Sequence, residues 1–529
     1  MRVLTAQEMQ RVDRRAIDEF GVPSLVLMEN AAIGIADALA ESFPTAETVC
    51  VLCGPGNNGG DGLALVRHLE ARGYGHRTYL VLGNSPPKGD AAVQLDILVR
   101  AELGVETVDG DSDLEPLLEA CRAADVVVDA LFGTGLSRPL EGHFAALVDA
   151  LDRLPVPLLA VDVPSGLDGS GGGVPGPHAR AEVTVTFAAP KVAHVLPPAS
   201  QSMGRVIVTD LGIPPHWVDE APGDLHLPVA EEMAASLLER PAESHKGTFG
   251  HALLVAGGPG TLGAALLATR AAVRGGAGLV TVAVPESLAA AADTTSLESM
   301  TLALPAGPDG GPSDAAVAAV VEACVGKAAV GIGPGLGTDP ATAEAVRHWV
   351  SGVDGVGLPI PLVLDAGGLD AYAGGLEALQ VRQAPTVLTP HPGEMGRLLG
   401  IPTQDVQADR LAAVRRASEA SGAIVVLKGH RSLVAAPAGG VWINPTGNAG
   451  MATGGIGDVL TGLLVALLGQ GYEPLVATQL GVWLHGLAGD LALVDGAPES
   501  LAAGDLLDAL PRAFRRTRHP EDNRSEDTP

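Results

Sequence analysis

A loop of small residues that leads to an acid is the part of this sequence most suggestive of chemistry. Residues 444–462 are rich in glycine, reach Asp458, and continue into an apolar segment with helical spacing that stops at Gly469. A glycine-rich loop that opens a helix presents free backbone N–H groups and the positive end of the helix dipole, so it can bind an anion. A carboxylate at such a place suggests a general base beside a phosphoryl-transfer site. The alternative is a plain glycine-rich turn, in which Asp458 is an acid favoured by the dipole.

Three more polar loops follow apolar runs in the first half of the chain. Residues 54–62 read Gly-Pro-Gly-Asn-Asn-Gly-Gly-Asp-Gly, and residues 129–138 and 162–168 also combine polar side chains with glycine. Loops at the carboxyl ends of parallel strands collect ligands, so these three could form one pocket; a structural turn is the alternative for 54–62. Their carboxylate, amide and hydroxyl oxygens would suit a hard cation such as potassium or magnesium. The oxygens belong to Asn58, Asp129 and Ser165.

The composition indicates a globular protein that does not bind polyanions. The 529 residues are 47% hydrophobic and 18% charged, which suits two or more domains with cores of their own. The net charge of −29 argues against a nucleic-acid partner and an anionic membrane surface. The N-terminus has no signal pattern and no uncharged apolar run is long enough to span a membrane, so we expect a cytoplasmic protein.

The elements that must position these loops alternate between short β-branched runs and helical stretches. Such alternation predicts parallel sheets covered by helices on both faces. A capping box at 5–8 predicts that the first helix begins there. Strands are predicted at 48–53, 77–82, 126–130, 158–163 and 182–187, and then at 251–256, 278–284, 328–332, 361–365, 386–389 and 424–427.

Proline-rich composition at 213–244 divides the two series of strands. We therefore predict two unlike α/β domains and a boundary near residue 220. The cysteines are expected in the cores, because Cys50 and Cys53 lie on one predicted strand and point to opposite faces. The predicted divisions are a first domain at 1–220, a linker at 221–243, a second domain at 244–511 and a flexible tail at 512–529.

Residues 1–215 resemble the NAD(P)H-hydrate epimerase domain of the YjeF N-terminal type. The resemblance rests on motifs at 7–13, 21–24, 27–30, 57–62, 162–166 and 187–191. It implies a Rossmann-like three-layer fold and a potassium ion at the Asn58, Asp129 and Ser165 positions. Asp162 is our candidate for the acid–base group, with Lys191 second, although Asp162 could instead cap the turn at Pro164. The resemblance also implies that the hydrate is bound by Asn57, Asn58, Gly59, Gly60, Asp61, Gly133, Thr134, Gly135, Leu136, Ser137, Arg138, Pro139 and Asp162.

Residues 244–510 resemble the ADP-dependent NAD(P)H-hydrate dehydratase, a member of the ribokinase-like superfamily. The motifs lie at 244–251, 256–264, 331–335, 388–394, 426–429 and 448–462. The resemblance implies hydrate contacts by Ala264, Gly335, His391 and Asp458. It implies nucleotide contacts by Lys428, Gly429, His430, Arg431, Ser432 and Gly457.

Three residues of this second domain carry further expectations. A magnesium ion is expected, with Glu394 contributing through water. His391 could instead be a turn histidine between two prolines. The loop at 365–370 lacks the second acid of the family pattern, so no role is assigned to it, and none is assigned to Lys246.

Together the two resemblances imply a bifunctional repair enzyme for nicotinamide nucleotides. The first domain would interconvert the R and S hydrates, NADHX and NADPHX, and the second would use ADP to return the S form to NAD(P)H, giving AMP and phosphate. Asp458 would accept the hydroxyl proton while backbone N–H groups of 454–457 stabilise the transferred charge. The alternative is a ribokinase-like small-molecule kinase fused to a non-catalytic ligand-binding or scaffold domain. We expect no nucleic-acid or membrane partner, and a homo-oligomer.

Overall fold

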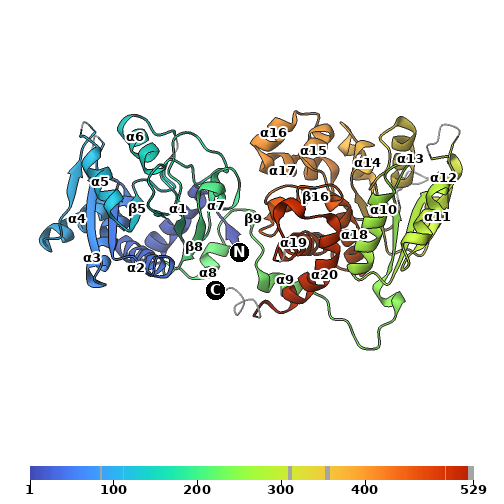
Figure 1. Cartoon of the computed structure of the whole chain (residues 1–529), viewed down its shortest axis with the longest axis horizontal. Coiled ribbons are helices and arrows are strands. Elements are labelled where there is room, and N and C mark those ends of the chain that lie inside the picture. Colours follow the sequence, from blue (N-terminus) through green and yellow to red (C-terminus); the bar gives the residue numbers. More distant parts are fainter. Residues whose placement is uncertain are drawn as a thin grey trace. The chain divides into compact units, whose positions relative to one another are not determined.

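The computed structural model of the chain describes residues 1–83, 86–110, 112–136, 138–307, 312–351, 358–494 and 496–521. Backbone contacts group the chain into two compact units, Met1–Leu225 and His226–Pro529. Each unit has the α/β architecture expected from the alternating pattern, with a largely parallel sheet (Figure 1). Among the described residues, no helix is both long and apolar enough to span a membrane.

The sheet of the first unit has the strand order β4-β3-β2-β5-β6-β7-β8, and each pair of neighbours is parallel. Helices α1 to α4 pack on one face, and α5 and α6 pack on the other. The strands are β2 (Thr48–Cys53), β3 (Gly75–Val81), β4 (Glu106–Val108), β5 (Val126–Ala130), β6 (Leu158–Val161), β7 (Val183–Phe187) and β8 (Arg205–Thr209). The helices are α1 (Ala6–Arg14), which continues as a π-helical turn at Arg15–Glu19, α2 (Ser24–Ser42), α3 (Asn57–Ala71), α4 (Gly89–Arg100), α5 (Glu115–Ala123), α6 (Gly142–Leu151), α7 (Val192–Val195) and α8 (Pro215–Asp219).

The strand order of the first unit reverses between β2 and β5. The chain builds outward from β2 to β4 and then returns to place β5 on the other side of β2. Loops that leave two such strands diverge, and the crevice between them is where open α/β sheets bind ligands. The polar loops after β2 and β5 therefore flank the expected binding place.

The two cysteines of the C-x-x-C pattern belong to different cores, as predicted. Cys50 packs with α5 and α6, whereas Cys53 faces the core formed with α2 and α3. The Cys50 and Cys121 sulfurs lie 3.6 Å apart as buried free thiols. Burial raises the pKa of Cys53. Their role is therefore packing.

In the second unit the strand order from β18 to β12 is β18-β17-β16-β15-β14-β13-β10-β11-β12. The pairs are parallel from β12 to β16, and β17 and β18 continue antiparallel. The strands are β10 (His251–Val255), β11 (Leu279–Pro285), β12 (Met300–Leu304), β13 (Ala329–Ile332), β14 (Leu362–Leu364), β15 (Thr386–Leu388), β16 (Ile424–Leu427), β17 (Leu433–Ala435) and β18 (Val441–Ile443). The helices are α9 (Ala230–Ser236), α10 (Leu262–Arg274), α11 (Glu286–Thr295), α12 (Asp314–Ala323), α13 (Pro340–Ser351), α14 (Gly367–Asp370), α15 (Pro392–Leu399), α16 (Thr403–Ala408), α17 (Arg410–Ser421), α18 (Ile456–Gly469), α19 (Pro474–Ala492) and α20 (Ala503–Arg518).

Helix α18 lies at the centre of the second unit, as its sequence predicts. Almost every residue after Asp458 is apolar or small, so the helix is buried on all sides, against α10, α19 and the sheet. It begins at Ile456, directly after the glycine loop, and ends at Gly469. The strand order of this sheet reverses between β10 and β13, which places a second binding crevice near the start of α10 and the loop after β13.

Two predicted irregular segments are helical in part. The stretch 221–243, predicted as a linker, contains α9, and Met233 on that helix is buried in the core of the second unit. The tail predicted from residue 512 begins inside α20, which continues to Arg518. Ala513 is fully buried, and basic side chains in the last turn favour the helix end. Apolar spacing therefore continues the helix past Pro511 and into the predicted tail.

Candidate active sites

In the first unit a cavity of about 560 Å³ lies at the carboxyl ends of β2, β5, β6 and β7. Helix α1 and the start of α3 provide two of its walls, and the loops after the strands provide the others. The polar loops that sequence reasoning brings together do converge here. Of the predicted hydrate-binding residues, Asn57, Asn58, Asp61, Gly133, Thr134, Gly135, Leu136 and Asp162 line the cavity.

Four other predicted residues of this set are described by the structure and do not line the cavity. Gly59 and Gly60 are buried in the first turn of α3, where Gly60 packs against Met28. Arg138 and Pro139 follow the cavity loop without facing the cavity. Ser137 lies outside the described residues.

Asp162 is a buried carboxylate that holds the middle of the cavity. Its Oδ1 accepts hydrogen bonds from Lys191 Nζ and Thr186 Oγ1, each at 3.0 Å, and its Oδ2 accepts one from Thr134 N–H at 3.1 Å. Burial acts to raise the pKa of Asp162, but Lys191 and the other donors outweigh burial and lower it to about 2. Asp162 is thus ionised at neutral pH, and its hydrogen bonds do not go to the Pro164 turn.

Lys191 and His194 hold Asp162 in place through hydrogen bonds. The Lys191 ammonium is 2% exposed and donates to Thr186 Oγ1, Phe187 O and Asp162, so its three protons are all used. His194 Nε2–H donates to the Asp162 carbonyl oxygen at 2.7 Å, and its Nδ1 accepts from the Lys191 N–H at 2.8 Å. Burial lowers the pKa of His194 to about 4, so the ring is neutral. Both residues position Asp162 and leave proton exchange to another group.

Asp13 is a cavity residue that sequence reasoning missed. It projects from α1, and its Oδ1 is buried without a hydrogen-bond partner in the described part of the chain. Burial raises the pKa of Asp13, the charge of Lys191 opposes this rise and the charge of Asp162 adds to it. The resulting pKa is about 6. The available signal was its spacing: an acid four residues after Met9 lies on the buried face of the helix.

Asp61 is a second carboxyl group with a raised pKa in the same cavity. It comes from the first turns of α3, opposite Asp13 and Asp162. Burial raises the pKa of Asp61 well above its usual value, and the charges of Asp162 and Asp13 raise it further. The cavity therefore holds one acid with a lowered pKa and two acids with raised pKa values.

Of the three residues predicted to hold a cation, Asp129 and Ser165 are in direct contact. Asp129 is buried and accepts from Ser165 Oγ at 2.6 Å and from Ser165 N–H at 2.8 Å. Burial raises the pKa of Asp129, partly offset by these bonds to Ser165. A Cβ placed on Gly133 would lie 2.9 Å from both Asn58 Oδ1 and Asp162 Oδ2, so Asn58 lies beside Asp162 in the cavity. The Asn58 side-chain nitrogen has no hydrogen-bond partner within the described ranges.

In the second unit the glycine loop forms the start of α18, as predicted. Gly455 takes the capping position with φ +90°, and Asp458 lies in the first turn. Asp490 of α19 anchors the loop by accepting from the Gly447 N–H at 2.9 Å and from Asn448 Nδ2 at 3.0 Å. His485 donates from Nε2 to the Ile456 carbonyl oxygen at 2.9 Å. These bonds fix the helix start from α19.

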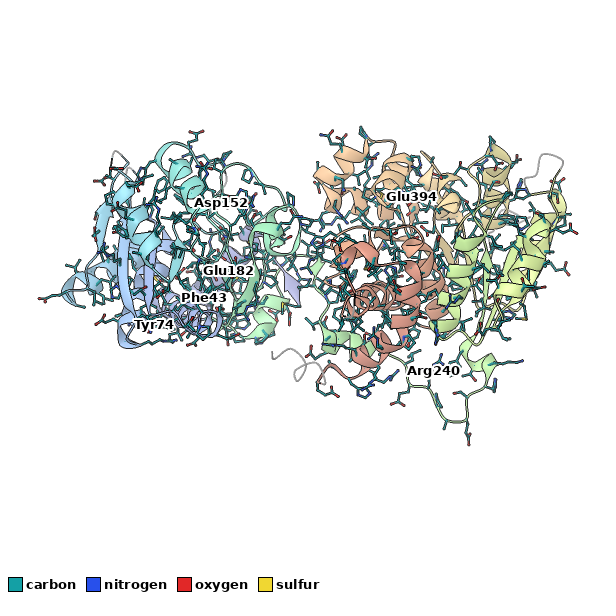
Figure 2. The ribbon with its side chains drawn as sticks, in the orientation of Figure 1. Phe43, Tyr74, Asp152, Glu182, Arg240 and Glu394 are labelled. Carbon is teal, nitrogen blue, oxygen red and sulfur yellow. The ribbon has the colours of Figure 1, made fainter. Side chains whose placement is uncertain are left out.

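Asp458 faces a cluster of charged side chains at the carboxyl ends of β14, β15 and β16. Burial raises the pKa of Asp458 to about 6; the charges of Asp365 and Glu394 add to this, and that of Lys428 opposes it. Lys428 Nζ lies 2.7 Å from Asp365 Oδ1 and 3.8 Å from Glu394 Oε2. Glu394 lies on α15 (Figure 2). Three carboxylates thus surround one ammonium.

The sequence assigned no role to the loop at 365–370, but in the structure Asp365 of this loop belongs to the charged cluster. It is 1% exposed, and its Oδ2 accepts from Thr461 Oγ1 of α18 at 2.8 Å while its Oδ1 binds Lys428. The carboxylate therefore ties the lysine to the helix that carries Asp458. A Cβ placed on Gly457 would lie 3.2 Å from Lys428 Nζ, so the ammonium lies against the start of the helix. The second acid of the family pattern is not needed for these contacts.

The remaining predicted residues of this site lie around the cluster. Thr261 Oγ1 donates to Gly335 O at 2.7 Å, which joins the start of α10, where Ala264 lies, to the loop after β13. Gly429, His430, Arg431 and Ser432 form the turn between β16 and β17. Lys246 lies in a turn before β10, at the amino end of that strand and not at the carboxyl end where the cluster lies.

His391 has a structural role in addition to its place near Glu394. Its Nδ1 accepts from the Gly393 N–H at 3.0 Å, and Glu394 Oε2 accepts from the His391 N–H at 2.7 Å, which forms the cap of α15. His391 therefore has the turn role that was the alternative prediction. The other ring nitrogen, Nε2, is 3.6 Å from Glu394 Oε1, and the side chain is 53% exposed, so a ligand could reach it.

Two family models match the chain, one in each unit. The model described as YjeF-related protein N-terminus matches residues 24–193, and the model described as NAD(P)H-hydrate dehydratase matches residues 252–512. Among solved structures, the second unit is similar to the ADP/ATP-dependent NAD(P)H-hydrate dehydratase from Bacillus subtilis. The identity is 33% and the TM-score 0.47, and the match covers 55% of this chain and 98% of that one.

Two relatives match along almost their whole length. This chain is 41% identical to the bifunctional NAD(P)H-hydrate repair enzyme Nnr of Moorella thermoacetica, over 97% of each chain. It is 37% identical to the enzyme of the same name from Thermofilum pendens, over 98% of this chain and 97% of the relative. The resemblance drawn from the motifs is thereby confirmed. The chain belongs to the family of bifunctional NAD(P)H-hydrate repair enzymes.

Proposed function

We propose that this chain repairs hydrated nicotinamide nucleotides at two active sites, an epimerase in the first unit and an ADP-dependent dehydratase in the second. The observation that carries the proposal is Asp458, a carboxylate in the first turn of α18 beside the Lys428 ammonium. A base and a cation at a glycine-rich helix start are what phosphoryl transfer to a hydroxyl requires. The substrates would be NADHX, NADPHX and ADP.

In the second unit Asp458 would accept the proton of the hydrate's hydroxyl as its oxygen attacks the terminal phosphorus of ADP. The bond from that phosphorus to the bridging oxygen breaks, AMP leaves, and backbone N–H groups of 454–457 stabilise the transferred charge. The ring nitrogen then expels phosphate, a better leaving group than hydroxide. Loss of a proton from the neighbouring carbon restores NAD(P)H.

The neighbours of Asp458 would hold the reactants. Lys428 would neutralise phosphate oxygens, with the 429–432 turn and Gly457 as further nucleotide contacts. Ala264, Gly335 and His391 would contact the hydrate. Because Asp365, Glu394 and Asp458 outnumber Lys428, their negative charge would favour a magnesium ion, to which Glu394 would contribute through water. When bound, magnesium would neutralise phosphate charge and orient the phosphoryl group. Use of ADP in preference to ATP is part of this proposal.

In the first unit Asp13 and Asp162 would divide the epimerase chemistry. Protonated Asp13 would give its proton to the hydrate's hydroxyl, which leaves as water with help from the lone pair of the ring nitrogen. The ionised Asp162 would stabilise the ring cation that results. Water that adds to the opposite face of the ring gives the other epimer, and its extra proton returns to Asp13. This assignment is supported by the different pKa values of the two acids, about 6 for Asp13 and about 2 for Asp162.

A potassium ion would suit the oxygens of Asn58, Asp129 and Ser165. The support is chemical: a buried carboxylate, a hydroxyl and an amide are oxygen donors, and burial penalises the charge on Asp129 unless a cation is near. When bound, potassium would hold the phosphate or hydroxyl oxygens of the hydrate near Asp162. Cytoplasmic location and homo-oligomeric assembly stay predictions from the sequence.

The test is an assay with the mixed epimers of NADH hydrate and ADP, followed by the return of NADH absorbance. We expect Asp458→Asn to slow that return by ~10²–10⁴, the usual loss for a removed acid–base group, while epimer exchange continues. Asp293→Asn is the matched control, because Asp293 is an exposed acid on α11 far from the charged cluster. No return of NADH with the unaltered chain, or a stable phosphate ester as product, would contradict the dehydratase.

A further inference from the structure

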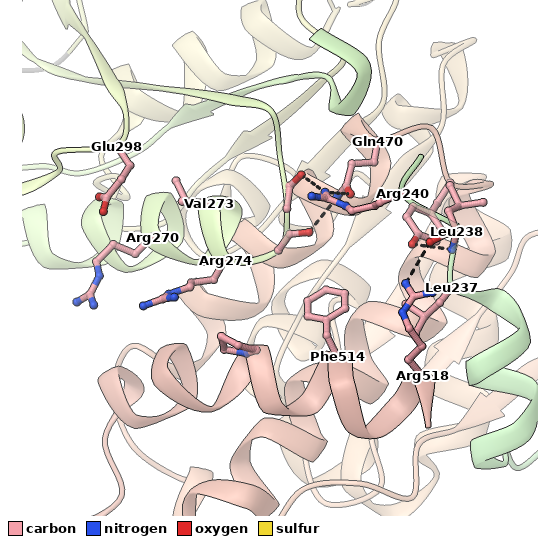
Figure 3. Close-up of a pocket in the computed structure, with 14 residues that line it drawn as sticks. Leu237, Leu238, Arg240, Arg270, Val273, Arg274, Glu298, Gln470, Phe514 and Arg518 are labelled. Carbon is pink, nitrogen blue, oxygen red and sulfur yellow. Dashed lines mark hydrogen bonds between the residues drawn. The ribbon is translucent and has the colours of Figure 1, made fainter. Parts of the chain in front are cut away.

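The second unit has another cavity, of about 530 Å³, away from the dehydratase site (Figure 3). Four arginines line it: Arg240 from the segment after α9, Arg270 and Arg274 from α10, and Arg518 from α20. Glu298 is the single acid among the lining residues. In a chain of net charge −29, this grouping of cations around one hollow is unusual.

The cavity lies at the far ends of the helices that begin at the dehydratase site. Helix α10 starts at Leu262, beside the predicted hydrate contacts, and ends at Arg274; α18 starts beside Asp458 and ends next to Gln470. Helices of 13 and 14 residues are roughly 20 Å long at 1.5 Å per residue. A ligand in this cavity therefore cannot be the nucleotide bound at Asp458.

Two of the four arginines are engaged with the protein. Arg240 donates to the Gly276 carbonyl and to Gln470 Oε1, the latter at 2.8 Å, and lies 3.8 Å above the Phe249 ring. Arg518 donates to the Leu238 carbonyl at 3.2 Å (Figure 3). These two side chains form part of the cavity wall, and their hydrogen bonds hold them in place.

The other two arginines lack such partners. Within the described ranges the Arg274 side chain has no hydrogen bond or ion pair, and the ion pair of Arg270 is a long one of 4.0 Å to the exposed Asp508. Figure 3 shows the two side chains leaving α10 on the same side, as positions i and i+4 must. Like charges at this spacing repel each other, so the pair is unfavourable unless an anion lies between them.

The helix dipole accounts for only part of this arrangement. Arg274 and Arg518 lie in the last turns of α10 and α20, where a cation is favourable. Arg270 lies a turn earlier and gains little from the dipole. The dipole also does not explain why arginines from three separate segments surround a hollow.

The walls favour an anion that carries an apolar part. Phe514, Leu237 and Val273 line the same cavity, and in Figure 3 the Phe514 ring lies between Arg274 and Arg518. A guanidinium binds two phosphate oxygens at once, and an aromatic ring can stack on a planar base. The volume is in the range of small-molecule sites. We propose that this cavity is a second nucleotide site, in which Arg270 and Arg274 bind the phosphates and the Phe514 side holds the base.

Equilibrium dialysis of the full chain with ADP or inorganic phosphate tests the proposal. We expect two ADP equivalents per chain, one at the proposed dehydratase site and one in this cavity. Arg270→Gln and Arg274→Gln, both at exposed positions that leave the core intact, should each weaken one equivalent at least about tenfold. Arg515→Gln, an exposed arginine of α20 outside the cavity, is the matched control and should bind like the unaltered chain.

The outcomes separate this site from the dehydratase. Loss of one ADP equivalent in the arginine variants, with dehydratase activity retained, supports the proposal. A single equivalent in the unaltered chain, or two that persist in both arginine variants, overturns it. Inorganic phosphate that binds the cavity as tightly as ADP would overturn the role given to the base. Failure of the dehydratase assay would leave this binding result unaffected.

Discussion

The pKa of the proposed base Asp458 depends on the charge of its neighbour Asp365. Burial and Asp365 raise its pKa to about 6, and Lys428 holds it from rising further. A general base works in its ionised form, so dehydratase kcat/KM should rise with pH through about 6 and level off above it. Asp365→Asn keeps an oxygen acceptor for Lys428 but removes the charge, so it should shift that limb to lower pH. A limb that stays in place would mean that Asp365 only supports the fold.

Asp13 should give the opposite pH dependence in the first unit. Its carboxyl group, with a pKa raised to about 6, would act in the protonated form, so epimerase kcat/KM should fall as pH rises through about 6. Asp13→Asn should remove that limb and lower the rate by ~10²–10⁴ after subtraction of the uncatalysed exchange. Asp18→Asn, an exposed acid of the following turn, is the control. A rate that rises with pH would exclude Asp13 as the acid.

The sequence predicted site residues best where a motif and a strand end coincide. Asp162, Asn58 and Asp458 follow apolar runs or glycine loops, so their placement could be inferred from position alone. Asp13 and Asp365 could not be found in this way. Asp13 matters because of what burial on α1 does to its pKa, and Asp365 because it bonds to a lysine 63 residues away. Long-range contacts of this kind have no signature in local spacing.

Gly455 determines where α18 begins, and a substitution there tests the role of the helix start. Its φ of +90° is rarely adopted by other residues, and an added Cβ would lie 2.6 Å from Leu267 Cδ1 of α10. Gly455→Ala should therefore cost about 1–3 kcal/mol of unfolding free energy and displace Asp458, with loss of dehydratase but not epimerase activity. Gly504→Ala is the matched control, since its Cβ meets open space, its φ is ordinary and it lies outside the 454–457 loop. Equal thermal stability and activity in both variants would contradict this.

Among whole elements, most buried strands were predictable and the edge strands were not. Strands β2, β5 and β13 are continuous apolar runs because helices cover both faces. Strands β4 and β8 lie at the edges of the first sheet, where β4 exposes two of its three residues and β8 has no fully buried residue, and they were missed. Strands β17 and β18 are largely buried but only three residues long, and they were missed as well. The end of α20 was missed because a proline and a polar composition concealed its apolar spacing. Tertiary packing decides these cases.

At the scale of the whole molecule, the two units have separate cores. The clusters that pack around the first sheet draw only on residues before 226, and the cluster around α18 draws only on residues after it. Each proposed site is likewise built from one unit. Fragments 1–225 and 226–529 should therefore fold separately, the first retaining epimer exchange and the second retaining ADP-dependent return of NADH. Far-UV circular dichroism and the two assays on the separate fragments check this. A fragment that folds but is inactive until the other is added would show that its site needs both units.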